Sequence, residues 1–212
     1  MTRHDGRTDV AVVIAVQQAA RAKSRLSADI PDELREALVL AMLDDVLTAV
    51  RGAHAGLVVV VSADTAYDEV ARTHGAEVLR DAGVGYRAAA VFALERLEGR
   101  AGAGLILPGD IPQLRSGDVA DALTQIEEAG VLLVPLEDGG TAALGLRPLD
   151  AIAPAFGPES AALHRTAALR AHVRFVEARY ASMRVDVDTR ADLDAVRAQA
   201  GPATRAVLDR LT

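Results

Sequence analysis

Residues 9–16, DVAVVIAV, and residues 103–110, AGLILPGD, are the two stretches that decide the fold of this 212-residue chain. Both are short apolar runs, which is typical of strands buried on both faces of a parallel sheet. After the first run comes a polar segment and then a long helical pattern that begins at Pro31, a residue tolerated at the start of a helix. A strand followed by a helix is the unit from which parallel α/β sheets are built.

The same alternation of strands and helices continues along the chain. Further strands are predicted over 56–62, 76–81, 130–140, 141–148, 172–178 and 182–188, and helices over 65–75, 86–99, 116–129, 160–171, 189–200 and 202–212. Ser116 is a candidate N-cap, and Thr189 with Asp192 three residues later forms an imperfect capping box. No repeat, low-complexity tract or linker interrupts the pattern. We therefore predict a single domain over residues 1–212, with an α/β fold and a mostly parallel central sheet.

The composition excludes several classes of protein. Asp and Glu number 30 against 23 Lys and Arg, and this formal net charge of −7 argues against nucleic acid or an anionic membrane as a partner. The absence of cysteine excludes disulfide scaffolds, thiolate zinc sites and cysteine nucleophiles. Neither a signal peptide nor a run of about 20 apolar residues is present, so we expect a cytoplasmic protein. The sequence does not indicate an oligomeric state.

Four polar segments follow predicted strands, and in open α/β sheets ligands bind beyond the carboxyl ends of the strands. The first segment, residues 17–26, carries Arg21, Lys23 and Arg25, and spaced cations of this kind suit the oxygens of a triphosphate. It contains no glycine, so it is not a P-loop. An ordinary solvated basic loop fits this segment equally well.

The second segment is LPGDIP, residues 107–112, where Asp110 falls at the end of a predicted strand. A carboxylate at this position suits Mg²⁺, which prefers oxygen ligands and needs only one or two protein carboxylates alongside phosphates. Taken alone, Asp110 is more simply explained as a turn or capping residue.

The third segment is VDVD, residues 185–188, in which Asp186 and Asp188 are two residues apart. In a strand the two carboxylates would point to the same face, where they repel each other unless a cation lies between them. A divalent metal site is therefore favoured over an exposed acidic strand end, and favoured clearly if Asp110 lies nearby.

The fourth segment combines Gly139, Gly140 and Thr141 with Gly157 and Ser160, which precede a predicted helix. Backbone amides, a hydroxyl and a helix N-terminus could together hold a phosphate or a carboxylate. An ordinary turn and N-cap is the alternative.

A histidine follows in the same predicted helix. His164 lies one turn into the helix on the side of Ser160, and a lone histidine is more often structural or exposed than catalytic. The five histidines show no zinc-ligand spacing.

Taken together and in this order, the motifs resemble those of one enzyme family. AVVIAV with AKSRL, LVLAMLDDVLTAV, LPGDIP, GGTAAL, FGPESAALH and VDVDTRADL, with the tail GPATRAV, are similar to the phospholactate/phosphoenolpyruvate guanylyltransferases of deazaflavin coenzyme F-420 biosynthesis. No single motif is very specific, but six in register over nearly the whole chain are. The resemblance implies a single-domain, glycosyltransferase-A-like (Rossmann-like) nucleotidyltransferase.

The resemblance also implies a reaction and a set of site residues. Such enzymes join GTP to a small phosphorylated three-carbon acid, phosphoenolpyruvate or 2-phospholactate, and release pyrophosphate, with Mg²⁺ as the metal. By position, the implied metal ligands are Asp110, Asp186 and Asp188, and the implied acid-binding residues are Thr141, Gly157 and Ser160. The implied nucleotide-binding residues are Gln17, Lys23, Arg25 and Tyr86, and Lys23, Arg25 and Asp110 carry the implied catalytic roles.

Two positions depart from the family pattern. Gln17 stands where the family usually has lysine, and Gly85-Tyr86-Arg87 stands near its usual G-L-N segment. Loss of a cation removes a charge-assisted contact worth about 1.5–3 kcal/mol. The alternatives are a paralogue that binds nucleotide with little turnover, and an enzyme that uses another nucleotide or phospho-acid.

Overall fold

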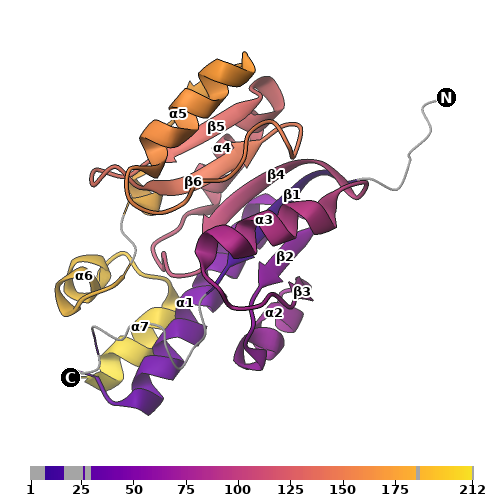
Figure 1. Cartoon of the computed structure of the whole chain (residues 1–212). Helices are drawn as coiled ribbons and strands as arrows, with labels where there is room; N and C mark the ends of the chain where they lie inside the picture. The colour runs from indigo at the N-terminus through magenta and orange to yellow at the C-terminus, as the bar shows by residue number, and fades with distance from the viewer. Residues whose placement is uncertain (1–7, 17–25, 27–29, 185–186, 212) are drawn as a thin grey trace.

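The centre of the molecule is a seven-stranded sheet in the computed structural model, which describes residues 8–16, 26, 30–184 and 187–211 (Figure 1). Its strands are β1 Thr8–Ala15, β2 Val58–Val61, β3 Glu77–Leu79, β4 Ala101–Pro108, β5 Val131–Pro135, β6 Thr141–Leu146 and β7 Phe175–Glu177. They lie in the order β3-β2-β1-β4-β6-β5-β7. Every neighbouring pair is parallel except the two pairs that include β6, which confirms the mostly parallel sheet.

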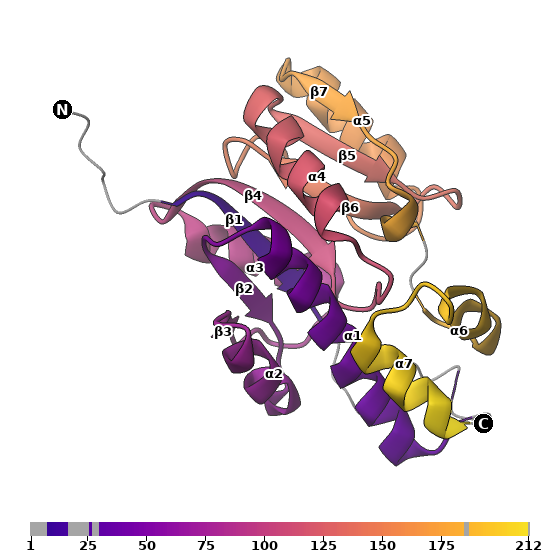
Figure 2. The same ribbon diagram turned by 180° about the vertical axis from the view of Figure 1, so that it is seen from behind.

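Helices cover both faces of this sheet, as Figures 1 and 2 show from opposite sides. The α-helices are α1 Asp32–Ala53, α2 Asp68–Thr73, α3 Tyr86–Leu97, α4 Ser116–Glu128, α5 Ser160–Ala171, α6 Arg190–Val196 and α7 Pro202–Leu208. The 3-10 helices are η2 Thr65–Tyr67, η3 Ala181–Met183 and η4 Asp209–Leu211. In β1, Val12 and Ile14 face α1, α2 and α4, whereas Ala11 and Val13 face α3 and α5, because successive strand residues point to opposite faces.

The antiparallel strand β6 brings its first residue to the edge of the sheet formed by the carboxyl ends of β1 and β4. The register pairs Ile106 with Leu144 and Gly104 with Leu146, so the amino end of β6 meets the carboxyl end of β4. Thr141, the first residue of β6, therefore lies at the same sheet edge as the residues that follow β1 and β4.

The C-terminal helices pack on α1 and form a third apolar cluster, which includes Leu38, Met42, Val187 and Leu193. Asp45, a buried residue of α1, accepts hydrogen bonds from the backbone amides at the start of α7, Ala203 N at 3.1 Å and Thr204 N at 2.8 Å. A carboxylate is favourable at this end of a helix, so Asp45 fixes α7 alongside α1 (Figure 2).

Two backbone hydrogen bonds join the C-terminal segment to the loop after β4. Val187 N donates to Asp110 O at 3.3 Å, and Gly201 N donates to Pro112 O at 2.8 Å. These bonds fix both ends of the segment that carries Asp188.

The strand predicted over 182–188 is wrong for the residues of this range that the structure describes, which leave out 185 and 186. Residues 181–183 form η3, and residues 187 and 188 have no strand pairing. Val187 is apolar for another reason: its side chain is fully buried in the third cluster, and its amide donates to the Asp110 carbonyl in the loop after β4.

The predicted N-cap Ser116 is also wrong, because Arg115 has the extended conformation of the N-cap and Ser116 is the first residue of α4. The Arg115 amide donates to Ser182 Oγ at 3.2 Å. By contrast, the capping box of Thr189 and Asp192 is present in full, with both reciprocal hydrogen bonds. In the part of the chain that the structure describes, no helix has the length and apolar character needed to cross a membrane.

Candidate functional site

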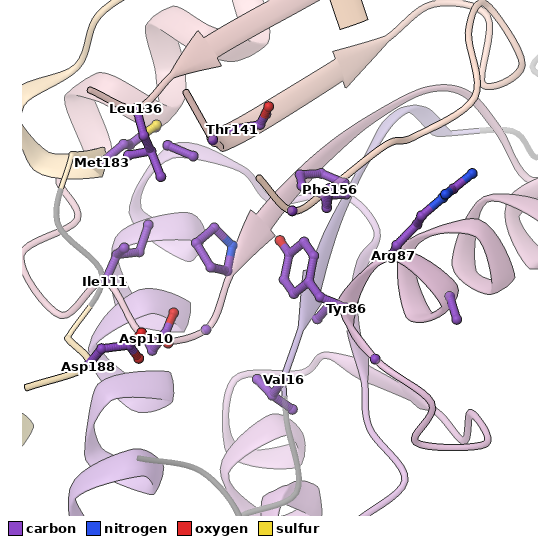
Figure 3. Close-up of a pocket in the computed structure, with 18 of the residues that line it drawn as sticks. Val16, Tyr86, Arg87, Asp110, Ile111, Leu136, Thr141, Phe156, Met183 and Asp188 are labelled. Atoms are coloured by element: carbon purple, nitrogen blue, oxygen red, sulfur yellow. The ribbon is translucent and has the colours of Figure 1, made fainter. Parts of the chain in front are cut away.

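A pocket of about 790 Å³ opens at the carboxyl ends of β1 and β4 (Figure 3). Its walls come from segments that are far apart in the sequence: 15–16, 84–88, 108–111, 136–142, 156–158 and residues 39, 67, 183 and 188. This is the sheet edge where open α/β folds bind ligands, and it is the edge at which the sequence predicts the site.

Two of the predicted metal ligands, Asp110 and Asp188, line this pocket. The Val187–Asp110 backbone hydrogen bond brings their segments together, and Figure 3 shows both carboxylates on the same wall. Among the residues described, no group of three His, Cys, Asp or Glu side chains could hold a metal ion. The third predicted ligand, Asp186, lies outside the described residues, as do the predicted nucleotide-binding residues Gln17, Lys23 and Arg25.

The three predicted acid-binding residues lie close together, but only two of them line the pocket. Thr141 and Gly157 are lining residues, whereas the Ser160 side chain is fully buried. The two hydroxyls are bonded to each other, with 2.8 Å between Thr141 Oγ1 and Ser160 Oγ. Thr141 is therefore the hydroxyl that faces a ligand, and Ser160 supports it.

The amides in the first turn of α5 are already engaged within the protein. Ser160 N donates to Gly157 O, Ala161 N to Gly139 O, and the next two amides to Glu159 O. The predicted binding of an anion by this helix N-terminus therefore finds these four amides occupied. Gly157, with φ of 123°, and Glu159, with φ of 57°, form the tight turn that brings the helix to the pocket.

The buried side chain of His164 contacts Thr141 of the Thr141–Ser160 hydroxyl pair. Its Nδ1 is 3.1 Å from Thr141 Oγ1, and its Nε2 accepts a hydrogen bond from Ala155 N at 2.9 Å. The imidazole is fully buried, and this burial lowers the pKa of His164 to about 4. Sequence reasoning favoured a structural or exposed histidine, and the buried position agrees with the structural reading.

Tyr86, the first residue of α3, lies on the opposite wall against Phe156, with ring centroids 4.7 Å apart in an edge-to-face arrangement (Figure 3). Within the described part of the chain its buried hydroxyl has no hydrogen-bond partner. Burial and the nearby charge of Asp110 raise the pKa of Tyr86 well above its usual value. A buried hydroxyl without a partner costs stability, so its position in a pocket indicates a polar ligand.

Several lining residues were not identified from the sequence. Leu136, Phe156 and Met183 form apolar wall, and only Phe156 carried a signal, since it begins the FGPES motif. Arg87 is the only positively charged side chain among the described lining residues, and Figure 3 shows it directed away from Asp110.

Comparisons with known proteins identify the family of the chain and its fold. Residues 10–206 match the family model described as guanylyl transferase CofC like. The phosphoenolpyruvate guanylyltransferase of Rubrobacter xylanophilus is 40% identical over 195 residues, which are 91% of this chain and 95% of that protein. The 3-phospho-D-glycerate guanylyltransferase of Phenylobacterium zucineum is 35% identical over 207 residues, 94% of each chain. Among solved structures, a candidate nucleotide-diphospho-sugar transferase of Desulfovibrio desulfuricans has a TM-score of 0.72 at 15% identity, covering 96% of this chain and 97% of that one, a likeness of fold.

Proposed function

The chain belongs to the family of CofC-like guanylyl transferases, as its motifs predict, and on this premise we propose that its pocket joins GTP to a small phosphorylated three-carbon acid. The observation that carries the proposal is the pocket itself. It gathers Asp110, Asp188, Thr141, Gly157 and Tyr86 from separate segments at one sheet edge, and these are residues that the motifs mark for metal, acid and nucleotide.

The proposed reaction needs no covalent enzyme intermediate. A phosphate oxygen of the acid attacks the α-phosphorus of GTP, the bond from that phosphorus to the β-phosphate bridging oxygen breaks, and pyrophosphate leaves with the bonding electrons. Catalysis then depends on holding the two anionic substrates in line and neutralising their charge. A pocket lined by loops at the carboxyl ends of β1 and β4 suits this task.

The donor set fits Mg²⁺. Asp110 and Asp188 offer hard carboxylate oxygens on one wall, and Mg²⁺ in nucleotide enzymes is bound by one or two carboxylates with substrate phosphates. We propose that these two residues hold the ion, with Asp186 as a third ligand. When bound, Mg²⁺ would neutralise charge on the triphosphate. The backbone bond from Val187 to Asp110 fixes the two carboxylate segments relative to each other.

Thr141 and Gly157 are proposed to bind the phosphorylated acid, with Ser160 supporting Thr141. Phosphoenolpyruvate is the first candidate and 3-phospho-D-glycerate the second, because relatives at 40% and 35% identity carry these names. At the nucleotide, we propose Gln17, Lys23, Arg25 and Tyr86. The Tyr86 hydroxyl, which has no partner among the described residues, gives a ligand a hydrogen-bonding group. From the family resemblance we propose that the reaction belongs to deazaflavin coenzyme F-420 biosynthesis, and we propose the cytoplasm as its location.

A substrate matrix tests the proposal. Each of the four nucleoside triphosphates is combined with phosphoenolpyruvate, 2-phospholactate or 3-phosphoglycerate in Mg²⁺ buffer, and pyrophosphate release is measured. We expect release with GTP and phosphoenolpyruvate. No release in any combination would refute the enzyme, and retained nucleotide binding in that case would support the non-catalytic alternative.

Two aspartate substitutions, one inside the pocket and one outside it, test the proposed metal site. Asp188→Asn should abolish Mg²⁺-dependent release while the circular dichroism spectrum stays unchanged. Asp150→Asn changes an exposed aspartate that does not line the pocket, and it should keep wild-type rates. Wild-type rates in Asp188→Asn would remove this residue from the metal site.

A further inference from the structure

The hydrogen bonds around His164 determine which of its nitrogens carries the proton. A backbone amide can only donate, so Nε2, which receives Ala155 N–H at 2.9 Å, must be the nitrogen with the lone pair. The ring is fully buried and neutral at physiological pH, because burial holds its pKa at about 4. The proton of a neutral imidazole then resides on Nδ1, and Nδ1–H donates to Thr141 Oγ1 at 3.1 Å.

The donor and the acceptor of the hydrogen bond between Ser160 and Thr141 can also be assigned. Within the described residues its Oγ bonds only to Thr141 Oγ1, at 2.8 Å, and the side chain is fully buried. If Thr141 donated to Ser160, the Ser160 proton would be buried without an acceptor, and that costs free energy. Satisfying every buried donor therefore makes Ser160 the donor and Thr141 the acceptor.

A threonine oxygen has two lone pairs and one proton. With Nδ1–H of His164 and O–H of Ser160 on the two lone pairs, the Thr141 proton is free to point elsewhere. Thr141 lines the pocket, so the remaining direction is the cavity. The two buried side chains turn a hydroxyl that could donate or accept into one that donates.

We propose that His164 is a positioning residue that, with Ser160, commits the Thr141 hydroxyl to donate to an anionic oxygen of the acid substrate. The inference rests on the proposed function, since it assigns the acid to Thr141. It also predicts selectivity: a phosphate or carboxylate oxygen is bound, and a group that can only donate is not.

Two substitutions of His164 separate its two hydrogen bonds. His164→Gln keeps an acceptor near the Nε2 position for Ala155 but loses the donor to Thr141. His164→Asn keeps a donor near the Nδ1 position and loses the acceptor. We expect His164→Gln to raise KM for phosphoenolpyruvate about tenfold and to leave KM for GTP unchanged. His164→Asn, which keeps the donor to Thr141, should raise KM for phosphoenolpyruvate much less.

A double-mutant cycle distinguishes positioning from mere packing. In a Thr141→Val background, which has no hydroxyl, His164→Gln should cause no further rise in KM for the acid. An equal rise in both backgrounds, a parallel rise in KM for GTP, or a loss in His164→Asn as large as in His164→Gln would overturn the proposal. His172→Asn, an exposed histidine that ends α5, is the matched control and should leave both KM values unchanged.

A measurement without turnover keeps this inference separate from the proposed function. The ¹⁵N spectrum of the imidazole in the wild-type protein reports which nitrogen is protonated, whether or not the protein releases pyrophosphate. A proton on Nδ1 is expected, and a proton on Nε2 would overturn the inference. Wild-type protein that shows the Nδ1 proton but never releases pyrophosphate would overturn the assignment of an acid to Thr141 and leave the hydrogen-bond directions standing.

Discussion

Acidification should destabilise this protein through His164 in particular. Its imidazole is fully buried, and burial lowers its pKa from 6.5 to about 4 in the folded chain. Because the folded pKa lies below the unfolded one, this contribution to stability is complete above about pH 6.5 and is lost as the pH falls toward 4.

The magnitude follows from the two pKa values. Near pH 5 the histidine of the unfolded chain is almost entirely protonated, while the folded ring, with a pKa of about 4, is mostly neutral. The free energy of unfolding should therefore fall by about 2 kcal/mol between pH 8 and pH 5 on account of this one group. A shift of this size is easily resolved in a urea titration.

The assay is urea unfolding followed by circular dichroism near pH 8 and near pH 5. His164→Gln lowers the free energy of unfolding at both pH values but removes the titrating group. Between pH 8 and pH 5 its free energy of unfolding should therefore decrease by about 2 kcal/mol less than that of the wild type. His172→Asn, which removes an exposed histidine, should keep the wild-type dependence. If His164→Gln lost as much stability on acidification as the wild type does, the neutral buried imidazole would be refuted.

Two further substitutions test other parts of the structure. Thr189→Ala removes the capping box of α6 and should cost about 1 kcal/mol in urea unfolding, whereas the control Thr124→Ala, at an exposed position of α4, should stay within about 0.5 kcal/mol; equal losses would contradict the cap. Gly109→Ala would bring a Cβ into steric conflict with Val16 Cγ1, so either the Val16 side chain or the loop carrying Asp110 must shift. We expect about 1–3 kcal/mol of destabilisation and a larger proportional loss of kcat than of bound nucleotide, and unchanged kcat would show that the loop tolerates the shift.

The strands could be predicted from sequence where a run is buried on both faces. The strands predicted over 9–16 and 103–110 correspond to β1 and β4, because residues 10–15 and 103–107 form uninterrupted apolar, buried runs. The strand predicted over 182–188 was wrong because Val187 is buried in a cluster formed by α1, α6 and α7, and a two-residue alternation does not distinguish that burial from burial in a sheet.

The candidate site was predictable where a strand end carries a polar group. Asp110, Asp188 and Thr141 were all assigned to one sheet edge, and they do line one pocket. Met183 and the partners of His164 could not be found in this way. An apolar wall residue looks like core, and the hydrogen bond between His164 and Thr141 spans 23 residues of chain, which periodicity cannot detect.

The two hydrogen bonds from Val187 and Gly201 to the loop after β4 have a consequence for motion. They anchor the Asp188 segment at both ends to the loop that carries Asp110, and Asp45 holds the helix that follows. Local opening of either acidic segment breaks its hydrogen bonds to the other, so we expect the two to open as one cooperative unit. Any ligand that bridges them stabilises the unit as a whole, and through α7 it also suppresses fraying of the chain's C-terminal end.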